Sequence, residues 1–453
     1  MLATIITRLV GWAVAIFYEV ERTGPPLSDG PVLVAANHPN ALVDPLVIFH
    51  TAGRTARPLA KAPLFEQALV GTVLKGLGGL PVYRRVDDQA LVHLNDRTFA
   101  AAIDALRAGG AVQIYPEGHS HSEPALAPLR TGAARIALMA EERSGWSLGL
   151  VVHPVGLTYT RKHLFRGRAV AAFGPTISVA GFRGTYERDQ REAVRRLTDT
   201  IAERLRGLTL NYERSEDREL VDVAERLYAR EKGLARPRER ESLAARLPRL
   251  RRFAEGLERL RNDEPERLAA LRSDVARYLR LLTVLGATEG DVPARYRPAA
   301  LVRYAVRQGA MLTLVFPVAA LGAAFWALPF VLTRRIAAGF RPKLDQVATY
   351  KVSVGILAFP SWLGLVSALT WWLASWRAGI VMLVLPPLAG LATVAWRERG
   401  SVALEDARVF LRSRGRSRAR RRLAEYRERL VAEFDAIASE WRAASSDRVD
   451  TAR

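Results

Sequence analysis

A histidine and an aspartate stand six residues apart in the stretch NHPNALVDPL, directly after the apolar run PVLVAA. The run has the composition of a buried strand. Pro39 keeps His38 out of helical geometry, and Asn40 can cap the helix that we expect to follow. Asp44 would then lie in the first turn, orient one ring nitrogen of His38 and leave the other free as a general base. The alternative is a capped helix start with one satisfied core histidine.

Two other chemistries can be read from the stretch YPEGHSHS, residues 115–122. Ser120 could be the nucleophile of a serine hydrolase, but the elbow of such enzymes is Gly-x-Ser-x-Gly and Ser122 stands in place of the last glycine. Glu117, His119 and His121 could bind zinc, since carboxylate and imidazole are zinc ligands. No further ligand cluster of suitable spacing accompanies them, so we expect no metal.

Short β-rich runs alternate with helical stretches from about residue 25 to residue 212. This alternation predicts an α/β fold, a largely parallel sheet flanked by helices. Every histidine lies at or before His163, so the chemistry belongs to this part. Strands are expected in PVLVAAN, ARPLAKA, GGLPVY, AVQIYPEG, LGLVVHPVGLTY and AVAAFGP, and helices in ALVDPLVIFH, LVHLNDRTFAAAIDALRAG and TGAARIALMAEERS.

Long apolar segments predict a membrane protein. Crossing a bilayer core takes roughly 20 helical residues. The first 24 residues are interrupted by Arg8 and lack a cleavage pattern, so we expect an interfacial helix rather than a removable signal, with a short transmembrane anchor as the alternative. Three uncharged stretches crowd the last third of the chain: Ala310–Thr333, Val352–Trp376 and Ala378–Trp396.

Charge suggests how these stretches meet the bilayer. The segment RRIAAGFRPK and the Arg-rich tail both have the composition of cytoplasmic flanks, which favours an even number of crossings. Residues 352–396 then form a spanning hairpin, while Ala310–Thr333, interrupted by Pro317 and Pro329, is re-entrant or interfacial. Three crossings are the alternative. The expected location is the inner (cytoplasmic) membrane, with the α/β domain on its cytoplasmic face.

Two charged regions flank the apolar block. Residues 213–300 are expected to be a helical connector, with one apolar stripe formed by Leu268, Leu271, Val275, Tyr278 and Leu282. The tail, residues 399–453, carries a second stripe on an amphipathic helix that could self-pair into a homodimer or face lipid. The expected domains are therefore residues 1–24, 25–212, 213–300, 301–398 and 399–453.

Composition excludes several classes of function. The formal charge of +21 is mostly arginine in helical segments beside acidic residues, without a nucleic-acid-binding signature. We therefore expect anionic lipid headgroups as partners rather than nucleic acid. The chain has no cysteine, which excludes disulfides, thiolate metal sites and a catalytic thiol.

Four blocks in order resemble the motifs of glycerolipid acyltransferases, enzymes that acylate glycerol-3-phosphate and lysophosphatidic acid. They are NHPNALVD, GLPVYRR, YPEG and VHPVGLTY. In most of the family four residues separate the motif's histidine from its aspartate, and here there are five between His38 and Asp44. This spacing resembles the yeast-type glycerol-3-phosphate/dihydroxyacetone-phosphate branch, and the C-terminal part looks like the extension of its bacterial members.

The resemblance implies a role for each matching residue. His38 and Asp44 would form the catalytic base pair, and Arg84 would contact the acceptor's phosphate, a task that suits a guanidinium. Lys61, in AKAPLF, would be a second phosphate partner. Glu117 and Gly118 would shape the acceptor pocket. The family's Thr-Arg-Ser after this glycine is HSH here, so Arg130 is a candidate replacement, while His153 is expected in the core or pocket wall.

The implied reaction is O-acyl transfer from acyl-CoA or acyl carrier protein to glycerol-3-phosphate or its 1-acyl form, without a cofactor. Two alternatives stay open: an acyltransferase for another lysophospholipid, and a non-catalytic membrane scaffold that binds lipid.

Overall fold

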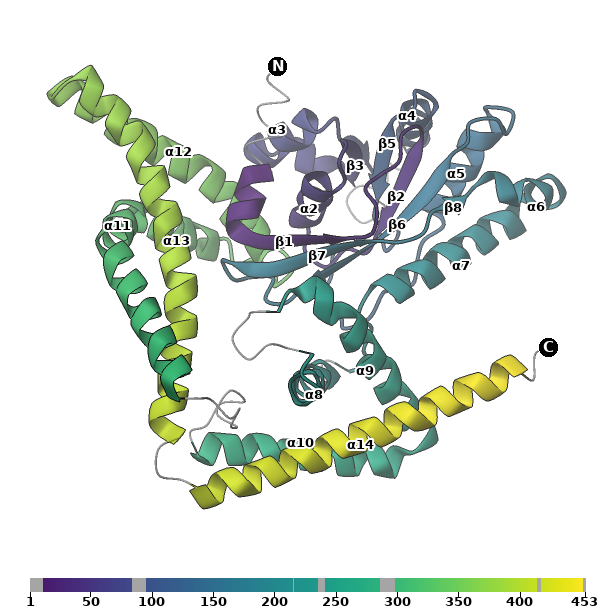
Figure 1. The fold of residues 1–453 in the computed structure, drawn as a ribbon. Helices are drawn as coiled ribbons and strands as arrows, with labels where there is room; N and C mark the ends of the chain where they lie inside the picture. Colours follow the sequence, from purple (N-terminus) through teal and green to yellow (C-terminus); the bar gives the residue numbers. More distant parts are fainter. Residues whose placement is uncertain are drawn as a thin grey trace. The chain divides into compact units, whose positions relative to one another are not determined.

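The computed structural model describes residues 11–83, 95–214, 216–234, 241–285, 298–413 and 417–450. The chain divides into two compact units (Figure 1). Unit 1 contains residues 1–211, 242–247 and 333–357, and unit 2 contains the rest. Each unit is described separately below.

Unit 1 is built on one eight-stranded sheet in the order β1-β7-β6-β2-β5-β3-β4, with β8 paired to β6. The pairs β6/β2, β2/β5, β5/β3 and β3/β4 are parallel, whereas β7 and β8 run antiparallel to β6. The predicted largely parallel α/β sheet is thus confirmed. The strands are β1 (Tyr18–Thr23), β2 (Val32–Ala36), β3 (Ala56–Lys61), β4 (Leu80–Val82), β5 (Ala111–Ile114), β6 (Val151–Tyr159), β7 (Gly167–Phe173) and β8 (Ile177–Ser178).

Helices cover both faces of this sheet. Successive side chains of β2 point to opposite faces, and all of them are apolar, so both faces must be covered. Val32 and Val34 point into one apolar cluster and Leu33 and Ala35 into the other, and all four are fully buried. The first cluster includes α2 (Val43–Thr51), and the second includes α4 (Asn95–Arg107), α5 (Gly132–Glu142) and α7 (Gln190–Leu208). The smaller helices of unit 1 are η1 (Ala62–Phe65), α3 (Ala68–Gly76), η3 (Ala180–Phe182) and α6 (Arg183–Arg188).

The N-terminal segment differs from the helix expected over the first 24 residues. Residues 11–17 are helical, but Tyr18–Thr23 forms strand β1 and pairs with β7 in parallel. Tyr18 is fully buried, so this stretch belongs to the sheet. Trp12 and Ile16 remain exposed, one turn apart on the short helix, which keeps an apolar face available for a bilayer surface.

Residues 333–357 join the sheet domain rather than standing apart in a membrane block. They comprise the last turns of α11 (Pro298–Gly339) and the first turns of α12 (Val347–Leu373). Ala348 and Val352 are buried in the same apolar cluster as α2. The connection between the first two long apolar helices is therefore part of the α/β domain.

Unit 2 contains long helices only, within the described residues. Among the described residues, three helices are long and apolar enough to cross a membrane, and they belong to unit 2 except at residues 333–357: Val306–Gly339, Val347–Leu373 and Trp376–Ser401. The two apolar stripes predicted in the charged regions are packed: all five residues of the first are buried, as are Leu423, Leu430 and Phe434 of the second. The remaining helices are α8 (Asp217–Glu231), α9 (Leu243–Asp263), α10 (Pro265–Leu285), α13 (Trp376–Ser413) and α14 (Ser417–Asp450).

The tail helix α14 packs on α10 and α8 of the same chain. Arg267 of α10 forms ion pairs with Glu433 and Glu440 of α14. The apolar stripe of α14, for which a second copy of the chain or lipid was the expected partner, thus packs within the chain. Helices α8 and α10 of the connector offer it a complementary apolar face.

Candidate active site

The carboxyl ends of four neighbouring parallel strands collect the predicted site residues at one edge of the sheet. His38 follows β2, Glu117 follows β5, and Lys61 ends β3 in register with Val82 at the end of β4. Ligands of open α/β sheets bind at this edge. Arg84 comes two residues after the end of β4 but lies outside the described residues.

His38 and Asp44 form a close pair. Nδ1 of the imidazole lies 2.8 Å from Oδ2 of Asp44, and the side chain of His38 keeps 15% of its surface exposed while that of Asp44 keeps none. The buried carboxylate engages Nδ1, so Nε2 is the ring nitrogen that could accept a proton from a substrate. Tyr115 stacks on the ring, with centroids 4.1 Å apart, and fixes its plane.

Three hydrogen-bond partners among the described residues surround the Asp44 carboxylate, which compensates its burial. Besides His38, the backbone amide of Asn40 donates to Oδ2 at 2.7 Å and the Tyr159 hydroxyl donates to Oδ1 at 2.7 Å. Burial, together with the nearby charge of Asp44, raises the pKa of Tyr159 well above its usual value, so this phenol stays a donor.

A turn at Ala41 accommodates the additional residue between His38 and Asp44. Ala41 has a φ of 40°, in the left-handed region. The carbonyl of Asn40 accepts from the amide of Val43 at 3.0 Å, and that of Ala41 accepts from Asp44 at 3.3 Å. Asn40 does not cap α2 as expected, because its side-chain amide donates to the Tyr18 hydroxyl at 2.9 Å.

Glu117 holds the His38 loop rather than facing outward. Its Oε1 accepts from the backbone amide of His38 at 2.7 Å, and its Oε2 accepts from the amide of Ala127 at 2.8 Å. His121 Nε2 lies 2.5 Å from the same Oε2. This hydrogen bond raises the pKa of His121 against the opposing effect of burial.

Gly118 lies under the guanidinium of Arg130. It adopts a φ of +79°, and a Cβ at this position would come within 2.7 Å of Arg130 Nε. Only glycine permits both the backbone conformation and this approach. The structure thus brings Arg130, the candidate replacement for the family's missing arginine, beside the YPEG motif.

Residues 18–158 match the protein family model described as Acyltransferase, and they contain the His38–Asp44 pair, the YPEG motif and their supporting strands. The chain carries an acyltransferase domain. Curated relatives include glycerol-3-phosphate O-acyltransferase 2 of Saccharomyces cerevisiae, which is 36% identical over 135 residues, 30% of this chain and 18% of the relative. Glycerol-3-phosphate O-acyltransferase 1 of the same yeast is 27% identical over 318 residues, 66% of this chain and 38% of the relative.

The chain spans less than half the length of both yeast relatives. Among solved structures, the 1-acyl-sn-glycerophosphate acyltransferase PlsC of Thermotoga maritima aligns over 45% of this chain and 77% of that chain, with 20% sequence identity and a TM-score of 0.34.

Several supports of the acyltransferase domain were not predicted from the sequence. The side-chain amide of Asn37 donates to the Leu157 carbonyl and accepts from its amide, at 3.0 and 2.6 Å, which fixes the His38 loop to β6. Lys162 donates to the carbonyl of Pro39 at 2.7 Å and to Ser122 Oγ at 2.8 Å. No local sequence pattern marks Lys162 or Tyr159 as a site residue, because each comes near His38 and Asp44 only when β6 pairs with β2.

The side chains of the YPEGHSHS stretch are not arranged for a serine nucleophile or for a zinc site. The Ser120 hydroxyl donates to Asp345 Oδ2 at 2.7 Å, not to a histidine base. His119 Nδ1 lies 3.2 Å from the Glu117 carbonyl oxygen, whereas His121 faces the carboxylate. His153 is 1% exposed and lies edge-on to Phe173, and burial lowers its pKa.

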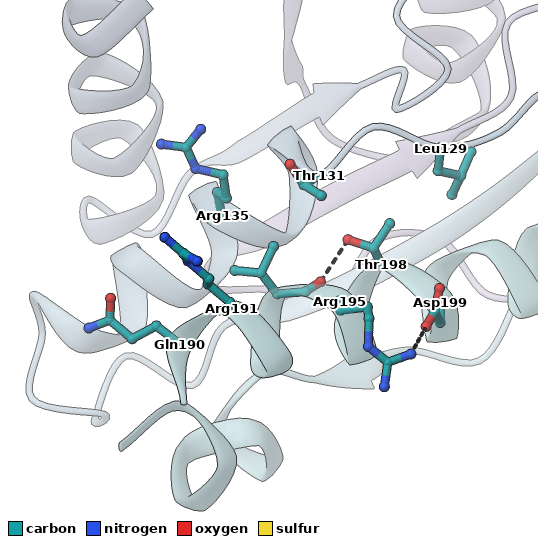
Figure 2. A pocket seen from close by; sticks show the side chains of 9 residues that line it. Leu129, Thr131, Arg135, Gln190, Arg191, Arg195, Thr198 and Asp199 are labelled. Carbon is teal, nitrogen blue, oxygen red and sulfur yellow. Dashed lines mark hydrogen bonds and ion pairs between the residues drawn. The ribbon is translucent and has the colours of Figure 1, made fainter. Parts of the chain in front are cut away.

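A surface pocket of about 530 Å³ lies elsewhere on the acyltransferase domain, lined by α5, α7 and the segment before α5 (Figure 2). Arg195 at its rim is paired with Asp199 and with Glu192. None of the predicted site residues lines this pocket, so it is separate from the His38–Asp44 pair.

Proposed function

We propose that this chain transfers a fatty acyl group from acyl-CoA or acyl carrier protein to a hydroxyl of glycerol-3-phosphate or 1-acylglycerol-3-phosphate, in phospholipid biosynthesis. The observation that carries the proposal is the 2.8 Å contact between the accessible His38 ring and the buried Asp44 carboxylate. Its position at the carboxyl edge of the sheet, within the family-model match, supports it.

In the proposed reaction, Nε2 of His38 accepts the proton of the acceptor hydroxyl while Asp44 stabilises the imidazolium that forms. The alkoxide oxygen attacks the thioester carbonyl, and the C–S bond breaks as the ester bond forms. His38 then returns the proton to the departing thiolate sulfur. A positioned base of this kind contributes about 10²- to 10⁴-fold to the rate. No covalent enzyme intermediate is needed, because the hydroxyl attacks directly.

Cationic side chains at the same edge would select a phosphorylated acceptor. Lys61 ends β3, Arg130 lies over Gly118, and Arg84 follows β4 in sequence. A guanidinium offers two parallel donors to phosphate oxygens, and an ammonium adds a point charge. Phosphate-free acceptors such as diacylglycerol should therefore react poorly.

The proposed location is the inner (cytoplasmic) membrane, with the acyltransferase domain on the cytoplasmic face. Three apolar helices suit a membrane-associated protein. An active site held at the interface would release its amphipathic product directly into lipid. The arginines at the base of the helices, Arg334, Arg335 and Arg341, favour the cytoplasmic side.

The test is an acceptor panel. Membranes containing the full chain receive labelled acyl-CoA with glycerol-3-phosphate, dihydroxyacetone phosphate, 1-acylglycerol-3-phosphate, another lysophospholipid or monoacylglycerol, and a parallel series uses acyl carrier protein as the carrier. Label should enter a phosphorylated glycerol and not monoacylglycerol. Equal rates with monoacylglycerol would contradict the phosphate-binding role of Lys61, Arg84 and Arg130. Label in the other lysophospholipid alone would show that this lipid, and not a glycerol phosphate, is the acceptor. No transfer with any acceptor would indicate a non-catalytic lipid-binding protein.

A further inference from the structure

The start of α12 and the connection before it contact the loops that hold His38 and Asp44, although they lie some 300 residues later in the chain. Ala348 and Val352 are buried in one cluster with Val43 and Leu46 of α2. Lys351 also donates to the His163 carbonyl at 2.7 Å. Apolar burial and hydrogen bonds therefore fix residues 345–352 on the acyltransferase domain. We call these residues the hairpin base, because they lead into the hairpin of α12 and α13.

The hairpin base contacts the start of the helix that carries Asp44. Helix α2 makes no side-chain cap of its own, and the amides of Val43 and Asp44 donate to the carbonyls of Asn40 and Ala41 in the preceding turn. The amide of Leu42, at the N-cap position, donates to Thr349 Oγ1 at 3.2 Å. Thr349 thus accepts from the amide of the N-cap residue, at the start of α2 and two residues before Asp44.

The hairpin base also contacts the loop on the other side of His38. Asp345 is only 5% exposed, and its Oδ2 accepts from the Ser120 hydroxyl at 2.7 Å. In the next residue, the backbone amide of His121 donates to the carbonyl of His38 at 3.1 Å. The buried carboxylate therefore fixes the loop that in turn fixes the backbone of His38.

We propose that Thr349 and Asp345 are positioning residues of the active site, through which residues 345–349 set the geometry of the His38–Asp44 pair. Neither needs to touch a substrate. Thr349 acts through the start of α2, and Asp345 acts through Ser120. The inference rests on the proposed acyl transfer for its kinetic effect, but its structural part can be measured without turnover.

The test uses the full-length protein in lipid nanodiscs with Thr349→Val, which keeps the shape and removes the hydroxyl, and Thr349→Ser, which restores it. Lys343→Ala in the same connection is the control, because this exposed residue contacts neither loop. Thr349→Val should lower kcat about 3- to 30-fold, because a displaced start of α2 moves Asp44 away from its place beside His38, with KM for both substrates nearly unchanged. Thr349→Ser should recover wild-type kcat.

A second set of variants tests the role of Asp345 through its hydrogen bond with Ser120. Ser120→Ala, Asp345→Ala and the double variant should lower kcat to the same level, because the three remove one interaction. Independent losses that multiply in the double variant would contradict the role of Asp345 through Ser120.

Hydrogen exchange separates failure of this inference from failure of the proposed function. Peptides covering residues 38–46 should exchange faster in Thr349→Val than in wild type, Thr349→Ser or Lys343→Ala, whether or not any acceptor is turned over. Unchanged exchange in folded Thr349→Val, or unchanged kcat in an active enzyme, would overturn the positioning role. Absence of turnover in wild type would count against the proposed function alone.

Discussion

The Asp44 carboxylate joins three parts of the acyltransferase domain at one point: the His38 ring, the turn at Asn40 and the Tyr159 hydroxyl on β6. The Asn40 amide and the Tyr159 hydroxyl donate to this carboxylate, and in the proposed reaction Nδ1–H of His38 donates to it as well. An isosteric amide would direct one N–H toward groups that are themselves donors. Each such mismatch of a buried polar group costs about 1–3 kcal/mol.

Asp44→Asn should therefore lower activity and stability together. We expect kcat to fall about 10²- to 10⁴-fold, since the neutral amide no longer stabilises the imidazolium or fixes its orientation. Acyl transfer and thermal unfolding of the same preparation provide the measurement. Asp29→Asn, at an exposed position before β2, is the matched control. Wild-type kcat in Asp44→Asn would exclude Asp44 from the chemistry.

The pKa of His121 links pH to the stability of the same loop. Its pKa is raised above the ordinary value of 6.5, first by the hydrogen bond to Glu117 and also by Glu123, while burial and Lys162 oppose the shift. The folded state thus binds the proton more tightly than the unfolded state. This stabilisation is fully present below pH 6.5 and is lost as pH rises through the raised pKa.

His121→Gln should remove this contribution. The melting temperature of wild type should exceed that of the variant most at low pH, and the difference should shrink as pH rises through the raised pKa. Melting curves between pH 5 and 9, roughly the span around an ordinary histidine, measure it. A constant difference across that range would contradict the assignment of the shift to His121.

At the scale of elements, the turn between β2 and α2 stores strain at Ala41. A left-handed conformation costs a non-glycine residue about 1–2 kcal/mol. Ala41→Gly should relieve it and raise the free energy of unfolding by about 0–1 kcal/mol, because the more flexible unfolded chain offsets part of the gain. Ala41→Val should destabilise, since a branched side chain tolerates this conformation least. Thermal unfolding of both variants in one lipid would test the turn; the reverse order would contradict it.

The sequence indicated the strand and helix pattern and the His38–Asp44 spacing because both are local. A continuous apolar run marked β2, apolar residues at three- and four-residue steps marked the helix stripes, and the motifs marked the ends of the strands. Residues 18–23 were assigned to the N-terminal helix because their pairing with β7 depends on a partner nearly 150 residues away. Tyr159, Lys162 and Thr349 were missed for the same reason: their places follow from tertiary packing, which no local pattern records.

At the scale of the whole molecule, contacts within the apolar helices bear on how they cross the bilayer. The first part of α11 lies along the second part of α13: Trp396 donates to the Leu312 carbonyl and Thr393 to that of Ala319, at 2.8 and 2.7 Å. The end of α11 returns to the start of α12, where Phe340 stacks on Tyr350. Pro329 lies between these two regions, at a position where a helix can bend.

We therefore expect α11 to be re-entrant and the hairpin of α12 and α13 to cross. The chain lacks native cysteine, so single cysteines can be labelled with an impermeant maleimide from either side of sealed vesicles. Arg307→Cys and Lys343→Cys, at the two ends of α11, should react from the same side as the acyltransferase domain. Ser375→Cys, between α12 and α13, should react from the opposite side. Labelling of positions 307 and 343 from opposite sides would instead indicate three crossings.

The central claim is that one imidazole, held by a buried carboxylate, removes the proton from the acceptor hydroxyl. Its most direct test is the turnover of His38→Gln, which keeps a polar side chain but cannot act as the base, compared with wild type in the same lipid and at saturating substrates. The proposed role of His38 predicts that kcat falls about 10²-fold or more while the protein stays folded and membrane-bound. A folded His38→Gln enzyme with a kcat within a few-fold of wild type would contradict it.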